Sequence, residues 1–191
     1  MELCEAVKKK LDHGLICITG QRASGKTELA KKLARHLNAG LYSFDCLYIP
    51  DYLRRKYGIT GCHPDAVHKS EAVEVLSKLR SGKDAPIYTA KGKKLFKSGT
   101  YHCQKYNIID GLGAVHFLDY FDLVIFVECD VEVEKKRRFE RDTKERGKNP
   151  EDVKKVFLLR RKQYEEFVLP KREKADILVK SGADYKLSLL A

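Results

Sequence analysis

The chain has 191 residues and a formal net charge of +11 at pH 7, from 38 Lys and Arg against 27 Asp and Glu. This length excludes a multidomain machine and fits a single domain over 1–191 with room for a full core. Hydrophobic residues make up 43% of the chain, which excludes a disordered protein. The positive surplus favours anionic partners: nucleic acid, a membrane surface or a small phosphorylated ligand.

The six cysteines are scattered without CxxC spacing, which is typical of reduced intracellular thiols. The pairs Cys62-His63 and His102-Cys103 lack a usual zinc spacing, so we expect no zinc site. No apolar stretch approaches the ~20 residues of a membrane helix. The charged segment 1–12 lacks the apolar centre of a signal peptide. We therefore expect a soluble, cytoplasmic protein.

Short apolar runs alternate with longer amphipathic segments. In chain order we expect a strand over 15–19, a helix over 26–38, a strand over 41–44, a helix over 64–79, strands over 106–109 and 123–127, helices over 131–146 and 150–167, and a strand over 175–179. Buried strands separated by helices predict an α/β fold with a mostly parallel sheet of five strands. Segment 84–104 contains glycines and many lysines, and predicts a small hairpin projecting from the sheet.

The segment 20–27 reads GQRASGKT and matches the phosphate-binding pattern G-x-x-x-x-G-K-[ST]. It follows a predicted strand and opens a predicted helix, so the backbone can wrap phosphates and the helix N-terminus adds positive charge. Lys26 is expected to reach the β- and γ-phosphates, and Thr27 to bind Mg²⁺. No Asn-Lys-x-Asp guanine-reading motif occurs, which argues against a GTPase. The expected nucleotide-binding residues are Gly20, Ala23, Ser24, Gly25, Lys26, Thr27 and Glu28.

Asp45 follows the second predicted strand, within the segment SFDCLY at 43–48. A carboxylate at the carboxyl edge of a parallel strand, beside the phosphate-binding loop, can accept the proton of an attacking hydroxyl. Taken alone, Asp45 fits a turn or a helix cap better. Asp45 stands between the phosphate-binding loop and three later segments, at 63–66, 108–111 and 135–148, and that context favours the catalytic role. Tyr48 is expected to line an acceptor pocket, with a plain core aromatic as the alternative.

These segments together resemble the uridine kinase/phosphoribulokinase group of P-loop kinases, over about 14–182. The other stretches that carry the resemblance are HPDA at 63–66, IIDG at 108–111, and the basic segment 135–148. The resemblance implies a P-loop NTPase fold of the nucleoside/nucleotide kinase type. It also implies a kinase that uses ATP and Mg²⁺ to phosphorylate a hydroxyl group, with Asp45 as the catalytic base.

The resemblance implies roles for further residues. Asp110 would steady Mg²⁺ through water, with a turn-forming Asp-Gly as the alternative. Segment 131–148 would be a helical lid whose arginines stabilise the transferring phosphoryl group. A solvated helix held by i,i+4 ion pairs is the alternative for that segment. The expected catalytic residues of the lid are Arg138 and Arg141, and the expected nucleotide contacts outside the loop are Arg137, Arg146 and Gly182.

The acceptor side departs from the resemblance. Cys62 and His68 stand where members of the group usually have Asp, and Thr89 replaces the Asp of a Tyr-Asp pair. The phosphate-handling residues are therefore intact, whereas the nucleoside-reading residues are eroded. The first expectation is a nucleoside such as uridine or cytidine, and the alternatives are a sugar phosphate, glycerate or pantothenate. The expected acceptor contacts are Asp45, Tyr48, His63, Asp65, Tyr88, Lys93 and Arg141.

A rival interpretation from another class is a nucleic-acid-associated P-loop ATPase. Against it, the basic residues are not interleaved with aromatics and no nucleic-acid-binding motif occurs. A nucleotide-binding regulator without activity is disfavoured because Lys26, Thr27 and Asp45 are intact. We expect ATP and a small hydroxyl acceptor as partners, without nucleic acid or membrane, and leave a homo-oligomer open.

Overall fold

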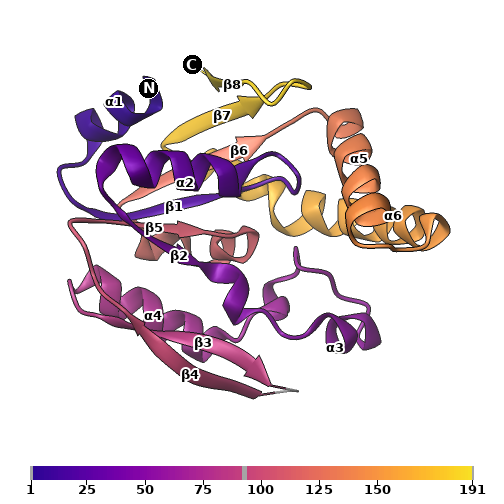
Figure 1. The fold of residues 1–191 in the computed structure, drawn as a ribbon, viewed down its shortest axis with the longest axis horizontal. Helices are drawn as coiled ribbons and strands as arrows, with labels where there is room; N and C mark the ends of the chain where they lie inside the picture. Colours follow the sequence, from indigo (N-terminus) through magenta and orange to yellow (C-terminus); the bar gives the residue numbers. More distant parts are fainter. Residues whose placement is uncertain (1, 92–93, 191) are drawn as a thin grey trace.

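The computed structural model describes residues 2–91 and 94–190 (Figure 1). Lys93, expected at the acceptor side, lies outside these residues. The main sheet has the strand order β2-β5-β1-β6-β7-β8. Its strands are β1 (Gly14–Gly20), β2 (Gly40–Ser43), β5 (Tyr106–Asp110), β6 (Leu123–Glu128), β7 (Ile177–Ser181) and β8 (Leu187–Leu190).

The five predicted strands are confirmed, and all pair in parallel. β8 adds a sixth strand, antiparallel to β7 at the edge of the sheet, beyond the five expected. A tight turn in which Tyr185 has a φ of 64° joins β7 to β8. The sequence did not predict β8 for two reasons. The strand has only four residues, and as an edge strand it is not buried on both faces, so it lacks a continuous apolar run.

Two helices cover one face of the sheet, α1 (Glu2–Lys10) and α2 (Lys26–Leu37) (Figure 1). Their apolar side chains form one core cluster with the central strands. Burying these apolar faces is the main stabilisation of this layer, at roughly 25 cal/mol per Å² of apolar surface. α2 ends at Asn38 in the left-handed conformation, with a φ of 50°, close to the predicted end.

The opposite face carries α4 (Lys69–Arg80) and the hairpin of β3 (Ala85–Lys91) and β4 (Lys94–Tyr101). The hairpin expected over 84–104 is therefore confirmed, as a separate two-stranded sheet. The helix expected over 64–79 starts late. Residues 64–66 form a single 3₁₀ turn, and Val67 is extended and pairs with Tyr48.

The helices α5 (Val131–Glu140) and α6 (Pro150–Phe167) project beyond the carboxyl ends of the strands. The short helix α3 (Asp51–Lys56) lies at the same end of the sheet, below α6 in Figure 1. The helix expected over 131–146 widens after Glu140 into a π-helical turn over 141–145. Gly147 then reverses the chain with a φ of 60°. Within the described ranges, no helix combines the length and apolarity needed to cross a bilayer.

Candidate active site

The phosphate-binding loop lies at the centre of the sheet, because β1 is flanked by β5 and β6. Gly20, Ala23 and Gly25 have φ angles of 119°, 57° and 90°, which curl the backbone between β1 and α2. A Cβ on Gly20 would stand 2.3 Å from the carbonyl oxygen of Val127, so only glycine fits there. The loop thus presents backbone N–H groups at the N-terminus of α2, which is the geometry that binds phosphate.

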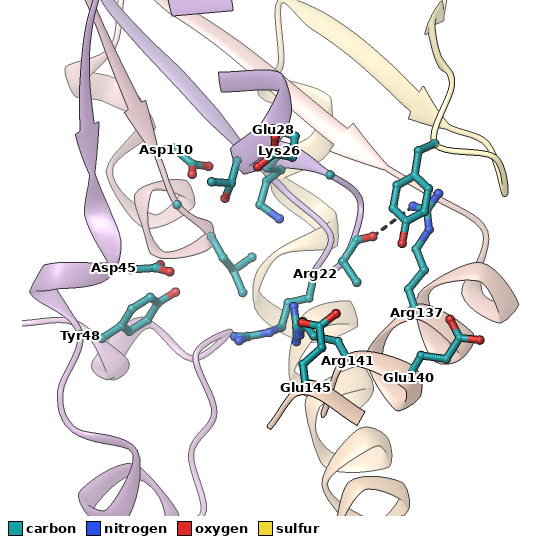
Figure 2. Close-up of a pocket in the computed structure, with 16 residues that line it drawn as sticks. Arg22, Lys26, Glu28, Asp45, Tyr48, Asp110, Arg137, Glu140, Arg141 and Glu145 are labelled. Carbon is teal, nitrogen blue, oxygen red and sulfur yellow. Dashed lines mark hydrogen bonds between the residues drawn. The ribbon is translucent and has the colours of Figure 1, made fainter. Parts of the chain in front are cut away.

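A cleft of about 550 Å³ opens over this loop (Figure 2). It lies at the carboxyl edge of the parallel strands, where α/β sheets bind ligands. The loop forms one wall, the end of β2 and the turn after it a second wall, and α5 with its π-helical turn a third. The side chains and backbone that line it are Arg22, Ala23, Gly25, Lys26, Thr27, Glu28, Asp45, Tyr48, Asp110, Gly111, Leu112, Arg137, Glu140, Arg141, Glu145 and Tyr185.

The side chains of Lys26, Thr27 and Asp110 lie at the floor of the cleft and suit Mg²⁺ and phosphate. Asp110 ends β5, is 7% exposed, and burial raises the pKa of its carboxyl, while Thr27 and Lys26 nearby oppose that rise. Within the described residues, the Oδ1 atom of Asp110 and the Oγ atom of Ser24 are buried without a hydrogen-bond partner. Those atoms would be satisfied by a hydrated cation and a phosphate oxygen.

No group of three metal-ligating side chains gathers in the part of the chain that the structure describes. A magnesium ion here would therefore complete its shell with water and phosphate oxygens, as Mg²⁺ commonly does. The Nζ atom of Lys26 lies 2.5 Å from the backbone oxygen of Gln21. Burial lowers the pKa of Lys26, and the nearby Asp110 carboxylate opposes that shift.

Asp45 and Tyr48 form the wall opposite the loop. A 3₁₀ turn over Phe44–Leu47 follows β2 and leaves Asp45 exposed, pointing into the cleft (Figure 2). The Tyr48 hydroxyl donates a 2.9 Å hydrogen bond to the backbone oxygen of Gly61. The guanidinium of Arg54 stacks over the Tyr48 ring at 5.1 Å. The two residues that the sequence assigned to the acceptor side therefore face the phosphate-binding loop.

The arginines of segment 131–148 divide into two groups. Arg137 and Arg141 line the cleft, and Arg137 donates to the backbone oxygens of Ala23 at 3.1 Å and Gly182 at 2.5 Å. Arg138 is only 1% exposed and lies outside the lining, paired with Glu134 at 3.3 Å.

Arg146 also lies outside the lining of the cleft and pairs with Asp142 at 3.5 Å. The ion pair expected for a solvated helix is present there, but Asp142 itself is buried. The segment is therefore partly anchored inside the protein.

Three further residues expected at the acceptor do not line the cleft. His63 caps the turn over 64–66 by accepting a hydrogen bond from the Asp65 N–H, and its ring packs against Phe167. Asp65 is exposed and pairs with Lys69 at 2.5 Å. Tyr88 belongs to strand β3 of the hairpin, is buried, and its hydroxyl donates a hydrogen bond to Glu74 at 2.5 Å. Their present contacts are structural.

Several lining residues were not predicted from the sequence. Arg22 occupies a variable position of the loop motif, which places no demand on its side chain. Glu140 and Glu145 belong to a basic segment in which the arginines, and not these glutamates, match the pattern of the family. Tyr185 lies beyond the last predicted strand, with its ring 3.7 Å from the Arg137 guanidinium. No sequence motif marked any of the four.

The Phosphoribulokinase / Uridine kinase family model matches residues 15–188. Uridine-cytidine kinase A of Dictyostelium discoideum is 30% identical over 183 residues, which cover 89% of this chain and 36% of that protein. A uridine kinase of Staphylococcus epidermidis is 27% identical over 192 residues, covering 92% of this chain and 91% of that protein. The chain thus spans about a third of the length of the first relative and most of the second.

Solved structures share the fold. Phosphoribulokinase from Rhodobacter spheroides superposes with a TM-score of 0.71 at 18% identity, covering 90% of this chain and 71% of that one. D-glycerate 3-kinase from Cryptococcus neoformans gives a TM-score of 0.66 at 12% identity, covering 99% and 96%. These likenesses confirm the α/β P-loop fold. With the family match over residues 15–188, they confirm the expected resemblance: the chain belongs to the phosphoribulokinase/uridine kinase family.

Proposed function

We propose that this protein is a kinase that transfers the γ-phosphate of ATP to a hydroxyl group of a small molecule. One observation carries the proposal: Asp45 and Lys26 line the same cleft from opposite walls, one beside the acceptor side and one in the phosphate-binding loop (Figure 2). A carboxylate facing a phosphate-binding lysine is what in-line transfer to a hydroxyl requires.

Each residue has a defined task in this proposal. The loop backbone and Lys26 hold the phosphates, and Thr27 and Asp110 would hold Mg²⁺, which neutralises phosphate charge when bound. Asp45 orients the acceptor hydroxyl and takes its proton as the oxygen attacks the γ-phosphorus. Arg141 faces the cleft and is placed to stabilise the charge on the transferring oxygens, while Arg137 and Tyr185 form the rim beside the loop.

A nucleoside such as uridine or cytidine is the first candidate acceptor, because the curated relatives carry those names. Glycerate, pantothenate and sugar phosphates are the alternatives. The side chains expected to read a nucleoside outside the cleft, His63 and Tyr88, are engaged in local contacts. His63 and Tyr88 therefore do not identify the chemical class of the acceptor.

The test of the proposal is phosphate transfer itself. The purified protein is incubated with γ-labelled ATP, Mg²⁺ and single acceptors from three groups: nucleosides, sugar phosphates and hydroxy acids. We expect one group to become labelled at a rate at least tenfold above the hydrolysis of ATP alone. Label that remains in ATP or appears only as inorganic phosphate with every acceptor would contradict the proposal. ATP turnover stimulated by RNA or DNA instead would favour the nucleic-acid-associated ATPase.

A further inference from the structure

Four arginines gather behind the acceptor wall of the cleft, and we call Arg22, Arg54, Arg138 and Arg160 the arginine cluster. The Nη1 atoms of Arg22 and Arg54 lie 2.9 and 3.1 Å from the point where a Cβ on Gly61 would stand. Both guanidinium groups therefore rest against the same stretch of backbone. Arg22 is also close enough to each of the other three for its charge to lower their pKa values.

The two deeper members are almost fully enclosed. Arg138 is 1% exposed and Arg160 is 9% exposed. Within the described residues, the Nε and Nη2 atoms of Arg138 and the Nε atom of Arg160 have no hydrogen-bond partner. Burial lowers the pKa of Arg160 to about 9, and the charges of Arg22 and Arg138 contribute to that shift. Buried guanidinium charge with so few acceptors is costly, and an anion bound nearby would offset part of that cost.

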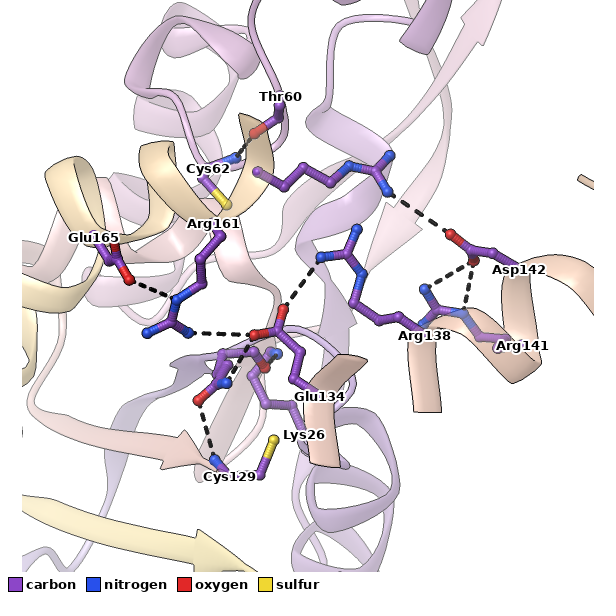
Figure 3. A network of polar contacts seen from close by, with 12 residues as sticks. Lys26, Thr60, Cys62, Cys129, Glu134, Arg138, Arg141, Asp142, Arg161 and Glu165 are labelled. Atoms are coloured by element: carbon purple, nitrogen blue, oxygen red, sulfur yellow. Dashed lines mark hydrogen bonds and ion pairs between the residues drawn. The ribbon is translucent and has the colours of Figure 1, made fainter. Parts of the chain in front are cut away.

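The carboxylates around the cluster are fewer than the basic side chains, and Figure 3 shows three of them, Glu134, Asp142 and Glu165, with their partners. Among the described residues, Asp51 pairs with Arg54 and Arg55, and Glu134 with Arg138 and Arg161. Asp142 is shared by four basic residues, namely Arg141, Arg146, Lys148 and Arg160. Arg161 also pairs with Glu165, so four carboxylates serve eight basic side chains.

Arg22 forms no ion pair within 4 Å inside the described ranges. Among the groups near Arg22, the Cys62 thiol is neutral, because burial raises its pKa. Cys62 is also close to Arg138. Arg22 and Arg138 therefore both approach a neutral thiol, while the carboxylates of Asp45 and Glu145 line the cleft that Arg22 also lines.

The position of Arg22 links this charge to the acceptor rather than to the nucleotide. Its side chain runs from the loop toward Tyr48, whereas Lys26 lies farther along the loop, toward Asp110 (Figure 2). The Tyr48 hydroxyl donates a hydrogen bond to the backbone oxygen of Gly61, the residue against which Arg22 rests. An anion held by Arg22 would therefore lie along the acceptor wall, on the side from which Asp45 faces the loop.

We propose that the arginine cluster binds an anionic group of the acceptor, a phosphate monoester or a carboxylate, on the same molecule whose hydroxyl is phosphorylated. This inference rests on the proposed kinase function. Guanidinium groups match both anions, because their planar N–H pairs donate to two oxygens at once. Arg22 and Arg54 make the direct contacts, and Arg138 and Arg160 add charge from behind.

Anion binding tests the inference without relying on turnover. The protein is saturated with Mg²⁺ and a non-hydrolysable ATP analogue, so that the phosphate-binding loop is filled, and is titrated calorimetrically with inorganic phosphate and, separately, with acetate. We expect saturable binding of at least one anion, weakened about tenfold or more by Arg22→Gln and left unchanged by Arg35→Gln on the exposed side of α2. Tighter binding of phosphate indicates a phosphate monoester, and tighter binding of acetate a hydroxy acid.

Two outcomes would overturn the inference: neither anion binds, or both bind Arg22→Gln as tightly as the unaltered protein. Arg54→Gln serves as the second variant if Arg22→Gln melts at a lower temperature. The same titration on Lys26→Ala without nucleotide gives an independent reading, because that change disables the loop and leaves the cluster intact.

Turnover separates the two proposals. If neutral nucleosides are phosphorylated equally well by Arg22→Gln and the unaltered protein, the kinase function stands and the anionic acceptor is wrong. If the anion binds through Arg22 but no acceptor is phosphorylated, the anion site stands and the kinase function fails. Preference for an anionic acceptor, with its KM raised about tenfold in Arg22→Gln and the KM for ATP unchanged, supports both.

Discussion

The side-chain amide of Gln21 donates a 2.8 Å hydrogen bond to the carboxylate of Glu134 and so joins the phosphate-binding loop to α5. The other end of the Gln21 amide accepts a 3.1 Å hydrogen bond from the Cys129 N–H, at the end of β6. Glu134 is buried and also pairs with Arg138 and Arg161 (Figure 3). The first turns of α5 are therefore fixed to the phosphate-binding loop.

Removing the charge of Glu134 should be strongly destabilising. In Glu134→Gln, the buried guanidinium of Arg138 loses its carboxylate, whereas the partly exposed Arg161 keeps its pair with Glu165. Breaking a buried ion pair typically costs about 3–5 kcal/mol. Glu132→Gln is the matched control on the same helix, because Glu132 is exposed and its pair with Lys135 is 3.7 Å long. Urea denaturation should show a large decrease in the free energy of unfolding for the first variant only. Equal effects of the two variants would contradict the account.

Two glycines of the phosphate-binding loop should differ in their tolerance of alanine. Both have positive φ, so each substitution carries backbone strain of about 1–2 kcal/mol. Gly20→Ala adds a clash with the backbone of Val127, whereas a Cβ on Gly25 meets nothing within 4 Å. We expect Gly20→Ala to lower the melting temperature far more than Gly25→Ala. Similar melting temperatures would show that the backbone of β6 yields to the methyl group.

Much of the fold could be predicted because it depends on local patterns. The apolar runs of β1, β5 and β6 are buried on both faces, which makes their signal continuous in the sequence. The phosphate-binding loop was predictable because its glycines and Lys26 are demanded by one backbone geometry. Asp45 could be placed because the carboxyl ends of parallel strands share an edge.

The remaining parts depend on contacts that spacing does not encode. Arg138 and Arg141 are three residues apart on a basic segment, yet one is buried and the other lines the cleft. The π-helical turn over 141–145 changes which side chains face inward, and no sequence pattern predicts it. Arg22 lies beside Gly61 and Arg54 only in the folded chain, so sequence spacing does not single it out.

His116 should make stability fall in mild acid. Burial lowers its pKa to about 4, and its ring contacts the backbone oxygen of Cys62 at 3.1 Å through Nε2. The unfolded chain takes up this proton near pH 6.5, whereas the folded protein does so only near pH 4. Stability is therefore lost as pH falls from about 6.5 to about 4, by about 2 kcal/mol at pH 5.

The variant His116→Gln keeps a hydrogen-bond donor but cannot titrate. Urea denaturation at pH 7 and pH 5 should show a smaller loss of stability for the variant than for the unaltered protein. His13→Gln is a suitable control, because His13 is exposed. Parallel losses in the unaltered protein and His116→Gln would show that His116 is protonated in the folded state at pH 5.

Asp45→Asn tests the central claim most directly, with Asp65→Asn as its control because Asp65 is exposed outside the cleft. The measurement is the rate of phosphate transfer from labelled ATP to the best acceptor, together with ATP affinity in the same preparations. We predict that Asp45→Asn lowers the transfer rate by about 10²–10⁴ while ATP binding changes little, because only the proton acceptor is lost. Asp65→Asn should transfer phosphate normally. A transfer rate for Asp45→Asn within about tenfold of the unaltered protein would show that Asp45 is not the base.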